Sequence, residues 1–272
     1  MQKTQFAYAQ WPWGTKTKEE FIVSCKEMAE VGFHYFESVR AFIDTFLDMP
    51  NEFHAITKEY DVKPVSFYFH FKGNPEQDLG ELNSKLHFVA SNDEIRTISI
   101  QAPKRGEKVT EEDLQYVIRT VNEYARICKP YGITPCIHPH HNTTVMYRDE
   151  IDYIMKNTDP DLIGFGPDTA HLVAGKCLPE DVFEAYKERI QFVHLKDITG
   201  ADAGSAGISG EIGVEVYDNF RELGEGIVNF PKVFEILKNV HYKGFLCGEL
   251  DRTRYTNKQS AIMTLDYLKK HW

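Results

Sequence analysis

Several short apolar runs in the second half of this 272-residue chain end in residues of the types that can bind metal ions or transfer protons. Such runs, rich in β-branched and aromatic residues, are typical of buried strands. The residues of this kind are His138, His140, His141, Asp168, His171, His194, Lys196 and Glu249, and they include five of the eleven histidines. Two imidazoles and two carboxylates would form a mixed nitrogen and oxygen donor set. Such a set suits Mn²⁺, Co²⁺, Fe²⁺ or Zn²⁺ better than Ca²⁺ or Mg²⁺.

The pattern predicts one divalent metal ion, bound by His138, Asp168, His194 and Glu249. Side chains alternate along a strand, so His138 and His140 share a face, and His140 is the alternative ligand. Open coordination positions would take water or two substrate oxygens. Lys196 cannot ligate a metal ion, but it follows His194 by two residues and shares its face, so we predict that it acts in the site.

The apolar runs alternate eight times with longer segments of helical periodicity. The predicted strands are 5–13, 34–39, 64–71, 95–102, 133–140, 162–168, 190–197 and 244–250. The predicted helices are 17–31, 51–60, 77–91, 110–129, 148–156, 179–189, 230–239 and 257–270. Thr17 with Glu20, and Thr110 with Asp113, predict capped helix starts. Because a barrel of this type needs about 250 residues, we predict an α/β fold with a single (β/α)8 TIM-barrel domain over residues 1–272. An open doubly wound sheet is the alternative, but no GxGxxG turn follows the first strand.

Barrel enzymes carry their site at the C-terminal ends of the strands, where the residues above are expected. The ends of other strands offer Trp13, Glu37, His70 and Arg252. Structural alternatives are that Trp13 packs the rim, that Glu37 pairs with Arg40, and that His70 caps a loop. The long loop 198–229 after the seventh strand is predicted to cover the pocket, or alternatively to form a contact in a homo-oligomer.

Charge and composition exclude several classes of protein. The formal net charge of −10 argues against a nucleic-acid-binding surface. The apolar runs are too short to cross a membrane, and the N-terminal residues lack the pattern of a signal peptide, so we expect a cytoplasmic protein. The five cysteines are an odd number without a CxxC pair, which predicts reduced, buried thiols rather than a disulfide framework.

The ordered motifs resemble the sugar isomerase/epimerase group of xylose isomerase-like TIM barrels. They are GFHYFES, HPHHNTTV, RDEIDYIMKNTDPDLIGFGPDTAHL, FVHLKD, FRELGEGIVNFPKVFEIL and GFLCGELDRT. Within this group the chain looks most similar to inosose dehydratases, which dehydrate 2-keto-myo-inositol. The resemblance implies one divalent metal ion, often Mn²⁺ or Co²⁺, with Zn²⁺, Fe²⁺ or Mg²⁺ as alternatives, and a keto-polyol or keto-sugar as the small-molecule partner.

The resemblance places His138 where many relatives carry Glu. Keto-sugar epimerases use one Glu on the fifth strand and another on the eighth, so the missing carboxylate argues for dehydration over epimerisation. The expected reaction is β-elimination of water, with Lys196, His140 and Glu37 as candidate acid and base, and a metal-lowered pKa for Lys196. Trp13, His70, His171 and Arg252 are the candidate substrate-binding residues. The alternative activity is a metal-dependent isomerase or epimerase of keto-sugars or keto-inositols. A phosphodiester-cleaving relative is opposed by the acidic charge, and a non-catalytic binding protein by the complete ligand set.

Overall fold

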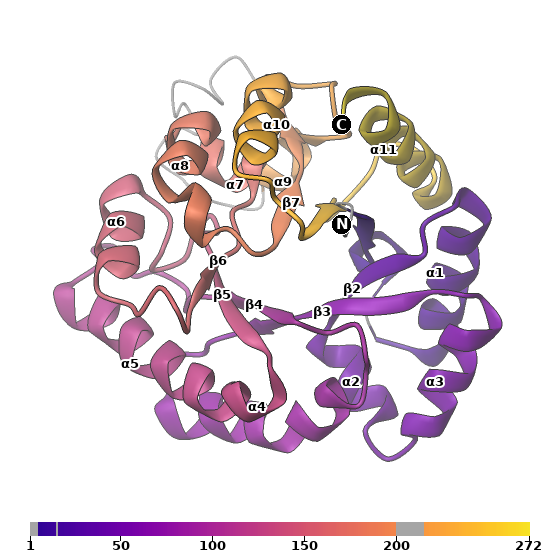
Figure 1. Ribbon diagram of the computed structural model, residues 1–272, viewed down its shortest axis with the longest axis horizontal. Helices are drawn as coiled ribbons and strands as arrows, with labels where there is room; N and C mark the ends of the chain where they lie inside the picture. The colour runs from indigo at the N-terminus through magenta and orange to yellow at the C-terminus, as the bar shows by residue number, and fades with distance from the viewer. Residues whose placement is uncertain (1–4, 15, 200–214) are drawn as a thin grey trace.

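Eight parallel strands form the central sheet of the computed structural model, which describes residues 5–14, 16–199 and 215–272 (Figure 1). The strands are β1 (Gln5–Ala9), β2 (Tyr35–Val39), β3 (Lys63–His70), β4 (Thr97–Gln101), β5 (Thr134–His138), β6 (Gly164–Phe165), β7 (Val193–Leu195) and β10 (Phe245–Gly248). Their order in the sheet is β6-β5-β4-β3-β2-β1-β10-β7. Parallel bridges from Phe165 to Ile190 and from Asp168 to His194 join the two outer strands. The sheet is therefore closed, and the predicted (β/α)8 barrel is confirmed.

Helices surround the strands on the outside of the ring (Figure 1). They are α1 (Lys18–Val31), α2 (Arg40–Phe46), α3 (Pro50–Glu59), α4 (Pro75–Ala90), α5 (Glu111–Cys128), α6 (Arg148–Lys156), α7 (Thr169–Ala174), α8 (Pro179–Tyr186), α9 (Glu215–Asn219), α10 (Phe230–Asn239) and α11 (Asn257–His271), with short 3₁₀ turns at Trp11–Trp13, Lys129–Tyr131 and Lys187–Arg189. Capping boxes begin α1 at Thr17 and α5 at Thr110, as predicted. Phenylalanines such as Phe21, Phe53 and Phe67 fill the space between strands and helices.

Besides α9, which lies within the predicted loop 198–229, two short helices, α2 and α7, were not predicted from the sequence. Helix α2 begins directly after β2, and it buries Phe42, Ile43 and Phe46. Helix α7 begins after Asp168, whose Oδ1 accepts the backbone N–H of His171 at 2.8 Å. Both helices are shorter than two full turns of an amphipathic pattern, so periodicity alone gives a weak signal for them.

The seventh strand is shorter than predicted, and the chain after it forms a second, two-stranded sheet. Residues Asp197–Ile198 (β8) pair antiparallel with Phe220–Arg221 (β9). The buried Asp197 carboxylate accepts backbone N–H groups of Gly224, Gly226 and Val228 at 2.8–3.0 Å. This carboxylate fixes the end of the predicted loop 198–229, whose residues 200–214 lie outside the described part of the chain. Among the described residues, no helix is both long and apolar enough to cross a bilayer.

Candidate active site

The four predicted metal ligands meet inside the barrel at the C-terminal ends of its strands. His138 ends β5, Asp168 follows β6, His194 lies in β7 and Glu249 follows β10. Between 0% and 3% of each residue is exposed. Ligand atoms of His138, His194 and Glu249 lie within 4.8 Å of one another, and the backbone bridge from Asp168 to His194 brings the fourth residue beside them.

Each of these four residues has one buried polar atom for which the described part of the structure offers no hydrogen-bond partner. The atoms are His138 Nε2, Asp168 Oδ2, His194 Nδ1 and Glu249 Oε2. Unpaired buried polar atoms cost free energy, and native proteins keep few of them. Two imidazole nitrogens and two carboxylate oxygens are also a suitable donor set for a divalent transition metal. The residues present therefore fit the predicted metal ion.

His138 and His140 differ in what their ring nitrogens contact. His138 Nδ1 lies 3.1 Å from the carbonyl oxygen of Gly166, so this nitrogen donates and Nε2 carries the free lone pair. The His140 ring lies against His171, with ring centroids 3.7 Å apart, and its Nδ1 donates to the carbonyl oxygen of His141 at 2.8 Å. Both rings thus donate from Nδ1 to a backbone carbonyl. The ligand atom of His138, however, lies with those of His194 and Glu249, whereas that of His140 lies with those of His141 and His171, which supports His138 as the metal ligand.

Lys196 is fully buried and is surrounded by acidic groups. Its Nζ lies 2.7 Å from Glu249 Oε1, 2.9 Å from Asp251 Oδ2 and 3.6 Å from Asp168 Oδ2. It also contacts His171 Nε2 at 3.2 Å and lies over the ring of Phe220. Burial by itself would lower the pKa of Lys196, but the three carboxylates outweigh burial and hold the pKa well above its usual value.

Without a metal ion, the carboxylates around the ammonium stabilise its charge, and the expected lowering of the Lys196 pKa by a bound metal ion stays a prediction. A group with a raised pKa keeps its proton at neutral pH, so it serves as a proton donor rather than as a base. Conversely, burial and the positive charges nearby hold the pKa of His140 well below its usual value. A neutral imidazole can accept a proton. The pKa values of the two groups are therefore shifted in opposite directions.

Glu37, the third candidate for proton transfer, has both oxygens occupied. Oε1 accepts the hydroxyls of Ser66 at 2.7 Å and Ser99 at 2.6 Å, and Oε2 contacts His194 Nε2. Its side chain is fully buried, and Arg40, the alternative partner from the sequence, pairs with Glu81 instead. Glu37 therefore faces the back of a predicted metal ligand and not the mouth of the barrel.

Tyr68 belongs to the site, although the sequence reasoning did not name it. Its ring packs edgewise against His138, with centroids 5.2 Å apart, and against Trp11. Its hydroxyl donates to Gln101 Oε1 at 2.7 Å, and the amide nitrogen of Gln101 lies 3.4 Å from His70 Nε2. Tyr68 precedes His70 by two residues on β3, so the alternation of the strand already placed it on the same face.

Two predicted substrate-binding residues lie elsewhere. The Trp13 indole N–H donates to Glu27 at 2.6 Å, and its ring packs edgewise on Tyr8. The 3₁₀ turn at Trp11–Trp13 points Trp11 toward Tyr68 instead, because a helical turn does not keep the alternation of a strand. Arg252 is exposed and lies 3.7 Å from Asp218, so the structure does not bring it to the cluster. His70 and His171, in contrast, lie at the cluster, through Gln101 and Lys196 respectively.

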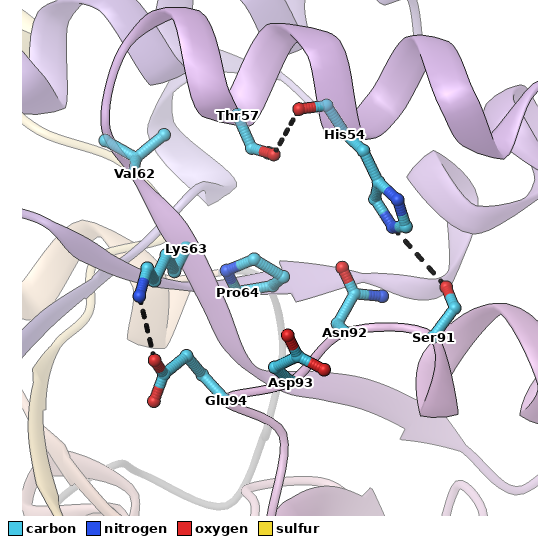
Figure 2. Close-up of a pocket in the computed structure, with 9 residues that line it drawn as sticks. All are labelled: His54, Thr57, Val62, Lys63, Pro64, Ser91, Asn92, Asp93 and Glu94. Atoms are coloured by element: carbon cyan, nitrogen blue, oxygen red, sulfur yellow. Dashed lines mark hydrogen bonds and ion pairs between the residues drawn. The ribbon is translucent and has the colours of Figure 1, made fainter.

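A separate surface cavity of about 220 Å³ lies at the opposite, N-terminal ends of β3 and β4 (Figure 2). Its polar groups satisfy one another: Lys63 pairs with Glu94 at 2.9 Å, and the Ser91 hydroxyl contacts His54 Nε2 at 3.4 Å. This face of a TIM barrel ordinarily serves stability rather than chemistry. The cavity contains none of the predicted site residues.

The model of the xylose isomerase-like TIM barrel family matches residues 25–271. The chain belongs to this family. Among curated members, it is 29% identical to an inosose dehydratase of Clostridium tetani over 221 residues, which cover 79% of this chain and 72% of the relative. It is 27% identical to an inosose dehydratase of Lactiplantibacillus plantarum over 167 residues, covering 60% of this chain and only 55% of that relative.

Solved structures show the same fold. The crystal structure of the IolI protein, which contains a bound zinc atom, superposes with a TM-score of 0.78 at 14% identity, covering 99% of each chain. The resemblance inferred from the sequence motifs is therefore confirmed at the level of the family and of its inosose dehydratase relatives.

Proposed function

We propose that this protein is a divalent-metal-dependent hydro-lyase that removes water from a keto-polyol such as 2-keto-myo-inositol. The observation that carries the proposal is the set of four buried ligand atoms without a hydrogen-bond partner, one each on His138, Asp168, His194 and Glu249. Curated relatives named inosose dehydratase support the substrate class. The match covers 55% of the length of the first of these relatives. The dehydratase activity of the relatives is therefore proposed for this chain.

His138 Nε2, Asp168 Oδ2, His194 Nδ1 and Glu249 Oε2 would hold the metal ion, with Mn²⁺ or Co²⁺ favoured and Zn²⁺, Fe²⁺ or Mg²⁺ as alternatives. When bound, such an ion withdraws electrons from a substrate carbonyl and so acidifies the neighbouring C–H group. Side chains of the protein would transfer the protons and orient the substrate.

The elimination needs one group that accepts a proton and one that donates a proton. His140 is neutral, and its Nδ1 is occupied by a carbonyl, so its Nε2 is suited to take the α-proton of the substrate. The electron pair of the broken C–H bond becomes the new C=C bond as the β-hydroxyl leaves. Lys196 Nζ, held protonated by Glu249 and Asp251, would give its proton to that hydroxyl, so that water departs.

Other buried groups would orient the substrate. Tyr68, Gln101 and His70 form a continuous polar wall on β3 and β4, which offers hydrogen bonds to the hydroxyls of a polyol. Burial and nearby carboxylates, Glu249 first among them, hold the pKa of Tyr68 well above its usual value, so its hydroxyl stays a neutral donor. His171 would support the proton donor through its contact with Lys196.

The test is a screen of keto-inositols and keto-sugars with protein reconstituted in turn with each metal ion, read by mass spectrometry. Loss of one water from the substrate supports the proposal. Conversion at unchanged mass would replace it by the alternative, an isomerase or epimerase acting at the same site. Turnover of keto-inositols that is unaffected by chelators would refute the metal dependence.

A further inference from the structure

We propose that Glu37 is a positioning residue that selects the nitrogen with which His194 binds the metal ion. The inference rests on the metal site of the proposed function and assigns a new role to a residue outside the ligand set. The Glu37 carboxylate is fully buried. Glu37 lies on β2, and β1 separates this strand from β10 in the sheet.

Three strands supply the surroundings of this carboxylate. Ser66 on β3 and Ser99 on β4 donate hydroxyl hydrogen bonds to Oε1, while His194 on β7 faces Oε2. Among the described residues, neither Lys nor Arg lies within ion-pair distance of Glu37, and His194 is its one ionisable hydrogen-bond partner. A buried carboxylate without a cationic side chain is costly, so the partners it has are expected to matter.

The contact with Glu37 determines how the protons of His194 are arranged. A carboxylate accepts hydrogen bonds, so the imidazole nitrogen that faces it, Nε2, must carry a hydrogen. The other nitrogen, Nδ1, is then free to offer its lone pair, and Nδ1 is the atom without a hydrogen-bond partner. Carboxylates of this kind raise the basicity of a ligating imidazole and fix its ring.

Neighbouring rings hold the orientation that this arrangement needs. The ring centroid of His194 lies 4.6 Å from that of His138 and 5.1 Å from that of Phe192, in edge-on contacts. His194 Nε2 also lies 3.5 Å from Glu249 Oε2, so both carboxylates face this nitrogen. A flip of the imidazole would turn Nδ1, the nitrogen without a hydrogen-bond partner, toward Glu37. Glu37 opposes this flip because its position is fixed in turn by Ser66 and Ser99.

The experiment compares wild type with Glu37→Gln, which keeps the size of the side chain and removes its charge. Co²⁺ is the probe, because ring N–H protons of Co²⁺-bound histidines give separate, strongly shifted and exchange-sensitive NMR signals. The structure predicts two such signals, from His138 Nδ1–H on Gly166 and from His194 Nε2–H on Glu37. In Glu37→Gln we expect one signal to shift or broaden, the other to stay, and Co²⁺ affinity to fall about 10- to 100-fold.

A matched control is Glu150→Gln, which neutralises another buried glutamate, one that pairs with Arg105 and caps α6 away from the cluster. It should leave both signals and the Co²⁺ affinity unchanged. If Glu37→Gln does not fold, the double variant Ser66→Ala/Ser99→Ala tests the same chain of contacts. It should shift the same signal with a smaller loss of affinity.

Two results would overturn the inference, and they are distinguishable. The first result is a Glu37 variant, or the serine double variant if that one is used, that keeps the wild-type Co²⁺ affinity and both signals unshifted. It would show that Glu37 is only structural. Failure of the wild-type protein to bind Co²⁺ would instead refute the metal site of the proposed function, and this inference with it.

Discussion

Replacing Lys196 by Met tests the central electrostatic feature of the site. The substitution keeps most of the aliphatic stem and removes an ammonium that lies 2.7–3.6 Å from the carboxylates of Glu249, Asp251 and Asp168. Removing one partner of a buried ion pair typically costs about 3–5 kcal/mol, because the remaining charge is left buried and uncompensated. For a chain of this size, that corresponds to a fall in Tm of roughly 10 °C in metal-free protein.

A divalent ion bound to Asp168 and Glu249 would supply the missing positive charge. We therefore expect Mn²⁺ or Co²⁺ to restore much of the lost stability of Lys196→Met, and to stabilise this variant more than wild type. Because Lys196 is the predicted proton donor, kcat of the metal-loaded variant should still fall about 10²-fold or more, with a smaller change in KM.

The assay combines thermal unfolding, with and without metal, and turnover of 2-keto-myo-inositol followed by mass spectrometry. Lys63→Met is the matched control, since Lys63 forms an exposed ion pair with Glu94 on the opposite face of the barrel. It should change neither kcat nor the response of Tm to metal. A kcat of Lys196→Met close to wild type would refute the assignment of Lys196 as proton donor.

Three further predictions concern the metal ion, pH and the segment after β7. The double variant Asp168→Asn/Glu249→Gln should bind no divalent ion in elemental analysis, whereas wild type should bind one per chain; full retention would contradict the ligand assignment. Burial lowers the pKa of His70 and of His141 to about 4, so the unfolded chain binds more protons than the folded one below about pH 6.5. Each of these two histidines should therefore reduce the free energy of unfolding of metal-free protein by on the order of 2 kcal/mol between pH 7 and pH 5. In urea titrations, His70→Gln and His141→Gln should each lose that part of the pH dependence; an unchanged pH dependence would contradict the burial argument. Asp197→Ala should lower the free energy of unfolding by roughly 3 kcal/mol or more, since it leaves several buried backbone N–H groups without an acceptor, and native-state hydrogen exchange should locate the loosening at Gly224–Val228.

The sequence alone determined the class of fold and the set of chemical groups. Eight repeats of a short apolar run and a helical segment require parallel strands joined by helices, and the length suits a closed barrel. Since strands in such a barrel all point the same way, residues that end the runs must meet at one face. This is why His138, Asp168, His194 and Glu249 could be grouped before any coordinates were available.

Only the tertiary structure decided which partners each group has within the set. Strand alternation made His138 and His140 equivalent, and the groups that their ligand atoms join then distinguished them: His194 and Glu249 for His138, His141 and His171 for His140. Proximity of Lys196 to a metal ion suggested a lowered pKa, whereas without a metal ion three carboxylates from two other strand ends raise it. Asp168, Glu249 and Asp251 lie 28, 53 and 55 residues from Lys196 along the chain. Local sequence contains no information about such neighbours, which set the charge and the protonation of a buried group.

Two physical causes explain the residues that the sequence misplaced. Trp13 and Arg252 lie after the last strand residue, where the period-two rule no longer holds, so their side chains turned toward Glu27 and Asp218. Glu37 lies within β2 and does point into the barrel, as predicted, but Ser66, Ser99 and His194 occupy both of its oxygens. Alternation along a strand determines which face a side chain occupies, whereas its partners depend on the other strands that close the barrel.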